Sequence, residues 1–223
     1  MRVSLRNIYQ FLRDIGHVII HRNLDSSDFF ILDERKLVYA SVAKSACSSI
    51  KTSMVGEFPG DRSIHYNTQH LSHKKIPRSK KPYFSFTYVR NPYDRLISCY
   101  KDKFVKKRGS FIYANYLFGY LSTDDSFEDF VRKVTRLPDF LCDRHFKSQS
   151  GIVFSRGARM DHIGRIEDLP GDFEDIRTRY GFAELGVLNR SRQPGDEALL
   201  TEEVREMVYN RYRKDFEAFG YER

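Results

Sequence analysis

The chain has 223 residues, of which 40% are hydrophobic, and this is enough for one domain with a buried core. Its net charge of +8 and pI of about 9.3 favour an anionic partner such as a nucleotide, a polyanion or a membrane surface. Three scattered cysteines indicate reduced thiols, and no apolar run approaches a membrane span or a signal-peptide core, so we expect a soluble cytoplasmic protein.

The first 21 residues carry apolar side chains at helical spacing. This stripe predicts a helix packed on the outside of the domain, and it consists of Ile8, Phe11, Leu12, Ile15, Val18 and Ile19. Residues 29–33 and 37–42 follow as two β-prone segments around a turn.

A possible phosphate-binding loop follows the second of these segments. The run from Leu37 to Val42 has the pattern of a buried parallel strand, and a helical pattern resumes with Ile50 and Met54 on one face. Between them lie small residues around one cation: Ala43, Lys44, Ser45, Ala46, Cys47, Ser48 and Ser49. Small side chains let the backbone approach an anion that the helix N-terminus and a lysine can neutralise. The alternative is an ordinary turn with a surface lysine, because the Gly-x-x-x-x-Gly-Lys-Ser/Thr pattern of nucleotide triphosphatases is not present.

Residues 61–82 form a polar, basic and histidine-rich connection. A connection of this length inside a compact domain is more often functional than idle.

A second strand, loop and helix begins at Phe84. The strand runs to Val89, Arg90 follows it, and Pro92 suits the first turn of the next helix. Arg90 and Ser98 could meet an anion together, although a surface ion pair and a solvated helix position explain them as well. Two such units in succession favour an α/β sheet that binds a phosphorylated ligand at the carboxyl ends of its strands.

The C-terminal third is predicted to be helical over residues 173–180 and 201–219, with a polar loop at 189–195 between them. Residues 101–108 carry five cations that could face a polyanionic acceptor, although a solvated helix face is the commoner explanation.

The two loop motifs together resemble those of sulfotransferases that use 3′-phosphoadenosine 5′-phosphosulfate (PAPS). Lys44-Ser-Ala-Cys-Ser-Ser is similar to the 5′-phosphosulfate loop of that family, and Arg90-Asn-Pro-Tyr-Asp-Arg-Leu-Ile-Ser98 to its 3′-phosphate motif. Three later stretches extend the resemblance to the carbohydrate-type branch, known as sulfotransferase family 2: 145–149, 161–169 and 212–221. The match departs from the family at Ala43, where proline is common, and at Cys47, where glycine or serine is common.

The resemblance implies one sulfotransferase domain over residues 1–223, with a P-loop-like parallel β-sheet flanked by helices. Its core would span about 36–221, and residues 1–35 would form a helical and β extension. The chain has no counterpart of the anchor and stem of Golgi-resident relatives, which implies a soluble catalytic domain.

The resemblance also assigns residues to the donor. Lys44 would stabilise the leaving 5′-phosphate, and the loop from Ser45 through Ala46, Cys47 and Ser48 to Ser49 would hold the phosphosulfate. Arg90 and Ser98 would hold the 3′-phosphate, and Arg192 belongs to a loop that in the family closes over the nucleotide. No metal is required, and no residue cluster has the spacing of metal ligands.

An acceptor hydroxyl needs a base near neutral pH, which points to histidine. In the resembled branch a histidine before the second strand has this role, and His70 fits best by its spacing to Ile76. His65 and His73 are the alternatives within the segment, and His145 is the next candidate outside it.

The sequence therefore predicts a PAPS-dependent sulfotransferase that acts on a hydroxyl of a carbohydrate or glycoconjugate, without nucleic-acid partners. The alternatives are a P-loop-like kinase or nucleotide-binding enzyme, and a non-catalytic basic polyanion-binding protein. The acceptor and the oligomeric state do not follow from the sequence.

Overall fold

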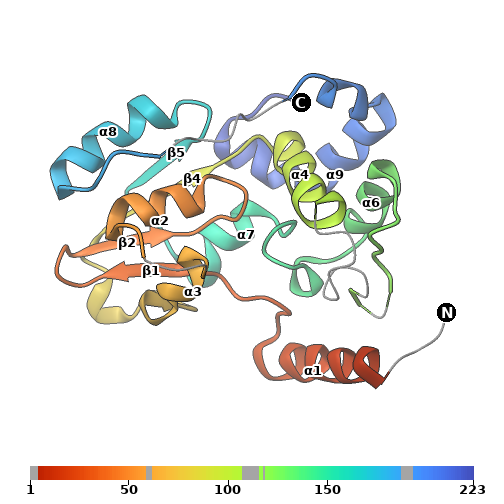
Figure 1. Cartoon of the computed structure of the whole chain (residues 1–223), viewed down its shortest axis with the longest axis horizontal. Coiled ribbons are helices and arrows are strands. Elements are labelled where there is room, and N and C mark those ends of the chain that lie inside the picture. The colour runs from red at the N-terminus through yellow and green to blue at the C-terminus, as the bar shows by residue number, and fades with distance from the viewer. Residues whose placement is uncertain (1–4, 59–61, 107–115, 118, 187–192) are drawn as a thin grey trace. The chain divides into compact units, whose positions relative to one another are not determined.

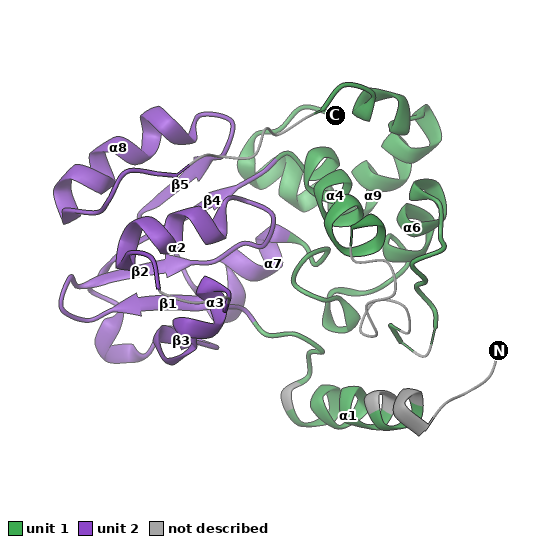
Figure 2. Ribbon diagram, in the orientation of Figure 1, with its two compact units in different colours: residues 1–26, 91–148, 192–223 green, residues 27–90, 149–191 purple. Residues whose placement is uncertain are grey.

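The structure is a computed structural model that describes residues 5–58, 62–106, 116–117, 119–186 and 193–223 (Figure 1). The chain groups into two compact units (Figure 2). We call residues 27–90 and 149–191 the sheet unit, and residues 1–26, 91–148 and 192–223 the helical unit. Each unit is described by itself.

The sheet unit contains a five-stranded sheet in the order β3-β1-β2-β4-β5. Its strands are β1 (Phe29–Leu32), β2 (Leu37–Ala40), β3 (Ser72–His73), β4 (Phe84–Val89) and β5 (His162–Arg165). β2, β4 and β5 run parallel, whereas β1 pairs antiparallel with both β2 and β3. The predicted parallel α/β sheet is confirmed for the three strands that carry the sequence motifs, and β1 belongs to the sheet as well.

Alternate side chains of the strands point to opposite faces of this sheet. On one face, Tyr39 and Phe86 pack with α2 (Cys47–Val55) and α8 (Leu169–Tyr180) in one buried cluster. On the other face, Val38 joins a smaller cluster with Phe29, Ile31 and Ala40. The helices therefore hold β2 firmly just before the loop that carries Lys44.

Gly164 allows β5 to lie close to its neighbour. A Cβ atom at this position would lie 2.2 Å from a ring carbon of Tyr88, so a larger residue would displace that buried ring. Glycine at this position therefore leaves room for the Tyr88 ring and the Asp172 carboxylate against β5.

The histidine-rich segment before β4 contains more regular secondary structure than its polar composition predicts. It forms α3 (Ile64–Asn67), the 3₁₀ turn η1 (Gln69–Leu71), β3 and a second 3₁₀ turn, η2 (Arg78–Lys80). Ser63 caps α3 by accepting from the backbone N–H of Tyr66. The helix α7 (Gln149–Val153) and the turn η5 (Ser155–Gly157) complete the sheet unit before β5.

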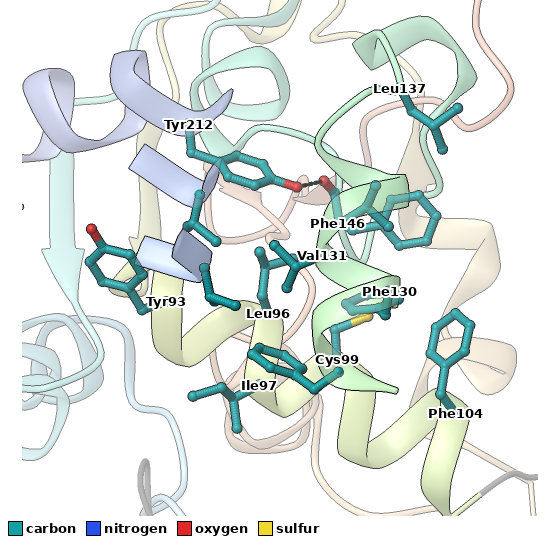
Figure 3. Close-up of a cluster of buried hydrophobic side chains, with 14 of the residues drawn as sticks. Tyr93, Leu96, Ile97, Cys99, Phe104, Phe130, Val131, Leu137, Phe146 and Tyr212 are labelled. Carbon is teal, nitrogen blue, oxygen red and sulfur yellow. Dashed lines mark hydrogen bonds between the residues drawn. The ribbon is translucent and has the colours of Figure 1, made fainter. Parts of the chain in front are cut away.

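The helical unit is built around an aromatic core (Figure 3). Its elements are α1 (Leu5–His21), α4 (Pro92–Tyr100), the π-helix η3 (Lys101–Val105), α6 (Phe127–Val134), the 3₁₀ turns η4 (Asp139–Leu141) and η6 (Asp196–Leu199), and α9 (Glu202–Phe219). Leu96, Phe130 and Phe146 are buried in this core, and the Tyr212 hydroxyl donates to the Phe146 carbonyl at 2.5 Å.

The predicted helix starts in this unit are confirmed. Asn91 caps α4 by accepting from Tyr93 N at 3.0 Å, with Pro92 in the first turn, and Thr201 caps α9. A carboxylate also holds this unit together: Asp139 accepts from the Ser148 hydroxyl and, at 2.6 Å, from Arg211. Among the predicted cations of residues 101–108, Lys101 pairs with Asp196, and Lys107 and Arg108 lie outside the described residues.

The helix predicted at the N-terminus is present as α1, but most of the described side chains of its apolar stripe do not pack as expected, and only Val18 is half-buried. Ile8, Leu12 and Ile19 are 40%, 61% and 73% exposed. The chain after α1 is held by polar contacts instead: Arg144 pairs with Asp25 at 2.6 Å. Within the described residues, no helix is long and apolar enough to cross a membrane.

Candidate active site

The loop from Ser41 to Ala46 leaves the carboxyl end of β2 and enters α2. Lys44 and Ala46 both adopt left-handed backbone conformations, with φ of 69° and 55°. Such conformations are unusual for residues other than glycine and concentrate at functional sites. Ala46 is the N-cap of α2 and has no polar side chain to occupy the first N–H groups of the helix. The first N–H groups of this helix are therefore available to an anion, and the predicted anion binding stays a prediction.

The second motif meets the first directly. β4 lies beside β2 in parallel register, with Ala40 opposite Thr87, so both strands end at the same edge of the sheet. Arg90 follows β4 and is only 6% exposed, and its Nη1 donates to the Lys44 carbonyl at 3.2 Å. The guanidinium of the second motif thus braces the backbone of the first.

Gln149 joins the two motifs from α7. Its Oε1 accepts from Arg90 N at 2.9 Å, its Nε2 donates to the Arg90 carbonyl at 2.7 Å, and the Ser45 hydroxyl lies 3.5 Å from Oε1. The side chain is fully buried. Sequence reasoning noted Gln149 only as part of a family-like element and gave it no role, because its partners are 59 and 104 residues away.

A histidine contacts the loop on its exposed side. His65 Nε2 lies 3.0 Å from the Ser48 hydroxyl and 3.9 Å from Cys47 Sγ. Both Ser48 and His65 are exposed, so a ligand at the start of α2 could reach the imidazole. This histidine is positioned by α3, and the sequence analysis gave it only as an alternative to His70.

A third cation lies at the same edge of the sheet. Arg165 ends β5 and is the register partner of Val89, the residue before Arg90. Arg165 is exposed. Its signal in the sequence was a basic residue at the end of a third strand, and the sequence analysis did not assign it a role.

Two buried tyrosines lie in the strands below these cations. Burial raises the pKa of Tyr39 far above its usual value, and burial together with the Asp172 carboxylate does the same to the pKa of Tyr88. Both hydroxyls stay neutral, so they do not offset the positive charge of Lys44, Arg90 and Arg165.

Other predicted site residues are placed differently. His70 lies on η1 and His73 on β3, and both are exposed. Ser98 lies on α4 of the helical unit and is half-buried, so its role beside Arg90 stays a prediction. His145 Nδ1 contacts the Asp143 carboxylate in the helical unit, and Arg192 lies outside the described residues.

The arrangement in the sheet unit can bind an elongated anionic group. Lys44 lies in the loop, the Ser48 hydroxyl and the first free N–H groups lie in the first turn of α2, and the Arg90 side chain contacts the loop from the end of the neighbouring strand. Charges fixed in this way stabilise negative charge that develops during a group transfer.

Comparison with known proteins agrees with this geometry. The sequence profile of the sulfotransferase family matches residues 27–222. Carbohydrate sulfotransferase 11 of Mus musculus is 22% identical over 240 residues, which cover 88% of this chain and 68% of the relative. Carbohydrate sulfotransferase 14 of Danio rerio is 26% identical over 172 residues (67% of this chain and 47% of the relative), and carbohydrate sulfotransferase 10 of Pongo abelii is 32% identical over 109 residues (42% and 30%). No solved structure matches the chain significantly. With the family profile matched over nearly the whole chain and the two sequence motifs in contact, this protein belongs to the sulfotransferase family and is a sulfotransferase enzyme.

Proposed function

We propose that the enzyme transfers a sulfuryl group from PAPS to a hydroxyl group of a carbohydrate. The observation that carries this proposal is the contact between Arg90 and the Lys44 carbonyl, which joins the two donor motifs at one edge of the sheet. Membership of the sulfotransferase family supports PAPS as the donor.

In this proposal the 5′-phosphosulfate lies at the start of α2. The backbone N–H groups from Ala46 to Ser49 and the Ser48 hydroxyl bind its oxygens. Arg90 binds the 3′-phosphate, and we keep Ser98 and Arg192 as predicted donor contacts. Arg165 adds positive charge at the same edge, where β5 ends.

The transfer is an in-line displacement at sulfur. The acceptor oxygen forms the new S–O bond while the bond from sulfur to the bridging oxygen of the 5′-phosphate breaks, and adenosine 3′,5′-bisphosphate leaves. Negative charge grows on that bridging oxygen, and Lys44 stabilises it. Catalysis then depends chiefly on positioning and electrostatics, as in phosphoryl transfer.

The acceptor proton needs a base, and we propose a histidine of the segment before β4. His70 remains the prediction from the sequence, but the contacts favour His65, because His65 reaches the Ser48 hydroxyl at 3.0 Å. A sulfuryl group bound beside Ser48 would place the attacking hydroxyl within reach of this imidazole. His73 and His145 are the remaining candidates.

A carbohydrate acceptor is supported by the relatives named above, which are carbohydrate sulfotransferases. A cytoplasmic location stays a prediction.

Transfer of ³⁵S from labelled PAPS to a panel of oligosaccharides tests the proposal. We expect labelled saccharide with the wild type and with Lys214→Ala, an exposed lysine of α9, but not with Lys44→Ala. Transfer of ³²P from γ-labelled ATP, with no transfer of ³⁵S, would contradict the proposal in favour of a kinase.

A further inference from the structure

The sheet unit contains a second basic site, far from the candidate active site. A cavity of about 620 Å³ is lined by Val38 near the start of β2, Ser85 near the start of β4 and Arg159 just before β5. These three strands are parallel, so the cavity lies at their amino ends, whereas Lys44 and Arg90 follow the carboxyl ends. The six residues of β4 alone separate the two edges by about 20 Å.

The lining of this cavity, which we call the basic pocket, is strongly cationic. Six of its fourteen lining residues are lysine or arginine: Lys75, Arg78, Lys80, Lys81, Arg156 and Arg159. No aspartate or glutamate is among the lining residues in the described part of the chain. Of the six cations there, the structure records an ion pair only for Lys80, with Asp33 at 2.5 Å. Folding does not require so many cations without acidic partners in one pocket. This cluster of positive charge suits a ligand with several anionic groups.

The pocket also has an apolar wall. Ile76, Tyr83 and Ala158 line it and pack against the buried cluster on that face of the sheet, which includes Val38. Carbon-bound hydrogens of a sugar ring can pack on such a wall while acidic substituents reach the cations. The volume lies within the range of sites that enclose a small ligand, so it can take a short stretch of a saccharide.

Single-stranded nucleic acid fits this pocket less well. Binding of that kind depends on several aromatic rings on which successive bases stack. Tyr83 is the one aromatic among the described lining residues, and the Lys80 ammonium already lies 5.2 Å from its ring centroid.

We propose that the basic pocket binds an acidic oligosaccharide, carrying carboxylate or sulfate groups, at a site separate from the donor site. The choice of a saccharide rests on the proposed function, whereas the choice of an anion rests on the pocket itself. The site holds the enzyme on anionic glycan chains without taking part in the transfer.

Calorimetry of the full chain without donor tests this proposal, with hexagalacturonate as the acidic probe, neutral maltohexaose of the same length and a ten-nucleotide RNA. We expect hexagalacturonate to bind, more weakly at higher salt, and to bind better than either other probe. The double variant Arg78→Gln/Arg159→Gln removes one exposed cation from each of the two lining segments, 75–83 and 155–159. It should weaken hexagalacturonate binding at least about tenfold.

The matched control is Arg136→Gln/Lys214→Gln, which removes the same charge from exposed positions in the helical unit. It should leave hexagalacturonate binding nearly unchanged, and both double variants should bind adenosine 3′,5′-bisphosphate like the wild type. Equal losses in the two double variants, stronger binding of RNA, or no binding of hexagalacturonate would overturn the proposal. Failure of the nucleotide to bind the wild type would instead count against the proposed function and leave the pocket result standing.

Discussion

Replacing Gln149 by leucine tests whether this buried amide holds the two donor motifs together. The change removes two short hydrogen bonds, of 2.9 Å and 2.7 Å, to the backbone N–H and carbonyl of Arg90, while the 3.5 Å contact with Ser45 is too long to count for much. Each backbone group left buried without a partner costs about 1–3 kcal/mol, so the free energy of unfolding should fall by roughly 2–6 kcal/mol. That is a large part of the stability of a typical domain.

Urea denaturation of Gln149→Leu measures this loss, and the matched control is Gln69→Leu, at an exposed glutamine of the same unit. We also expect weaker binding of adenosine 3′,5′-bisphosphate, because Arg90 would no longer be fixed at the end of β4. If both variants unfold at the same urea concentration, the amide does not fix this strand end and the reasoning is wrong.

Three further predictions concern charge and protonation. Lys44→Ala should lower kcat far more than it lowers donor affinity, and Lys44→Arg should restore little, because a planar guanidinium does not replace a compact ammonium; equal losses of rate and affinity would contradict this. Alanine replacements of His65, His70 and His73, made one at a time, should cost ~10²–10⁴ in kcat only at the residue that acts as the base, and similar losses in all three variants would contradict a single base. Burial works against the charge of Asp139, yet its serine and arginine partners keep the pKa of the carboxyl below its usual value, so its stabilising effect is full at neutral pH and is lost as the pH falls through that lowered pKa. In urea denaturation, Asp139→Asn should therefore lose more free energy of unfolding relative to the wild type at pH 7 than at pH 3. An equal loss at both pH values would refute a stabilising role of the ionised Asp139.

The parallel part of the sheet was predictable because β2 and β4 are short, apolar and bounded by turn residues. The antiparallel pairing of β3 was not, since Ser72 and His73 are two polar residues whose strand state depends only on pairing with β1. The periodicity of α1 predicted a helix correctly. It did not show what its apolar face would contact, because periodicity carries no information about the neighbouring surface.

The candidate site likewise contains residues that the sequence identified and residues that only the structure revealed. Lys44 and Arg90 were identified because each follows a strand with a distinctive local pattern. Gln149 and His65 gained their roles only in three dimensions, since their partners Arg90 and Ser48 lie 59 and 17 residues away along the chain. Long-range hydrogen bonds of this kind leave no periodic signal in a single sequence.

The most direct measurement of the central claim is a calorimetric comparison of adenosine 3′,5′-bisphosphate with adenosine 5′-monophosphate, because it needs no acceptor. If Arg90 binds the 3′-phosphate, the bisphosphate should bind the wild type at least about tenfold more tightly, since a charge-assisted contact contributes roughly 1.5–3 kcal/mol. An Arg90→Ala variant with the circular dichroism of the wild type should lose most of this preference. Equal affinity of the wild type for the two nucleotides would contradict the assignment of this edge of the sheet as a PAPS site.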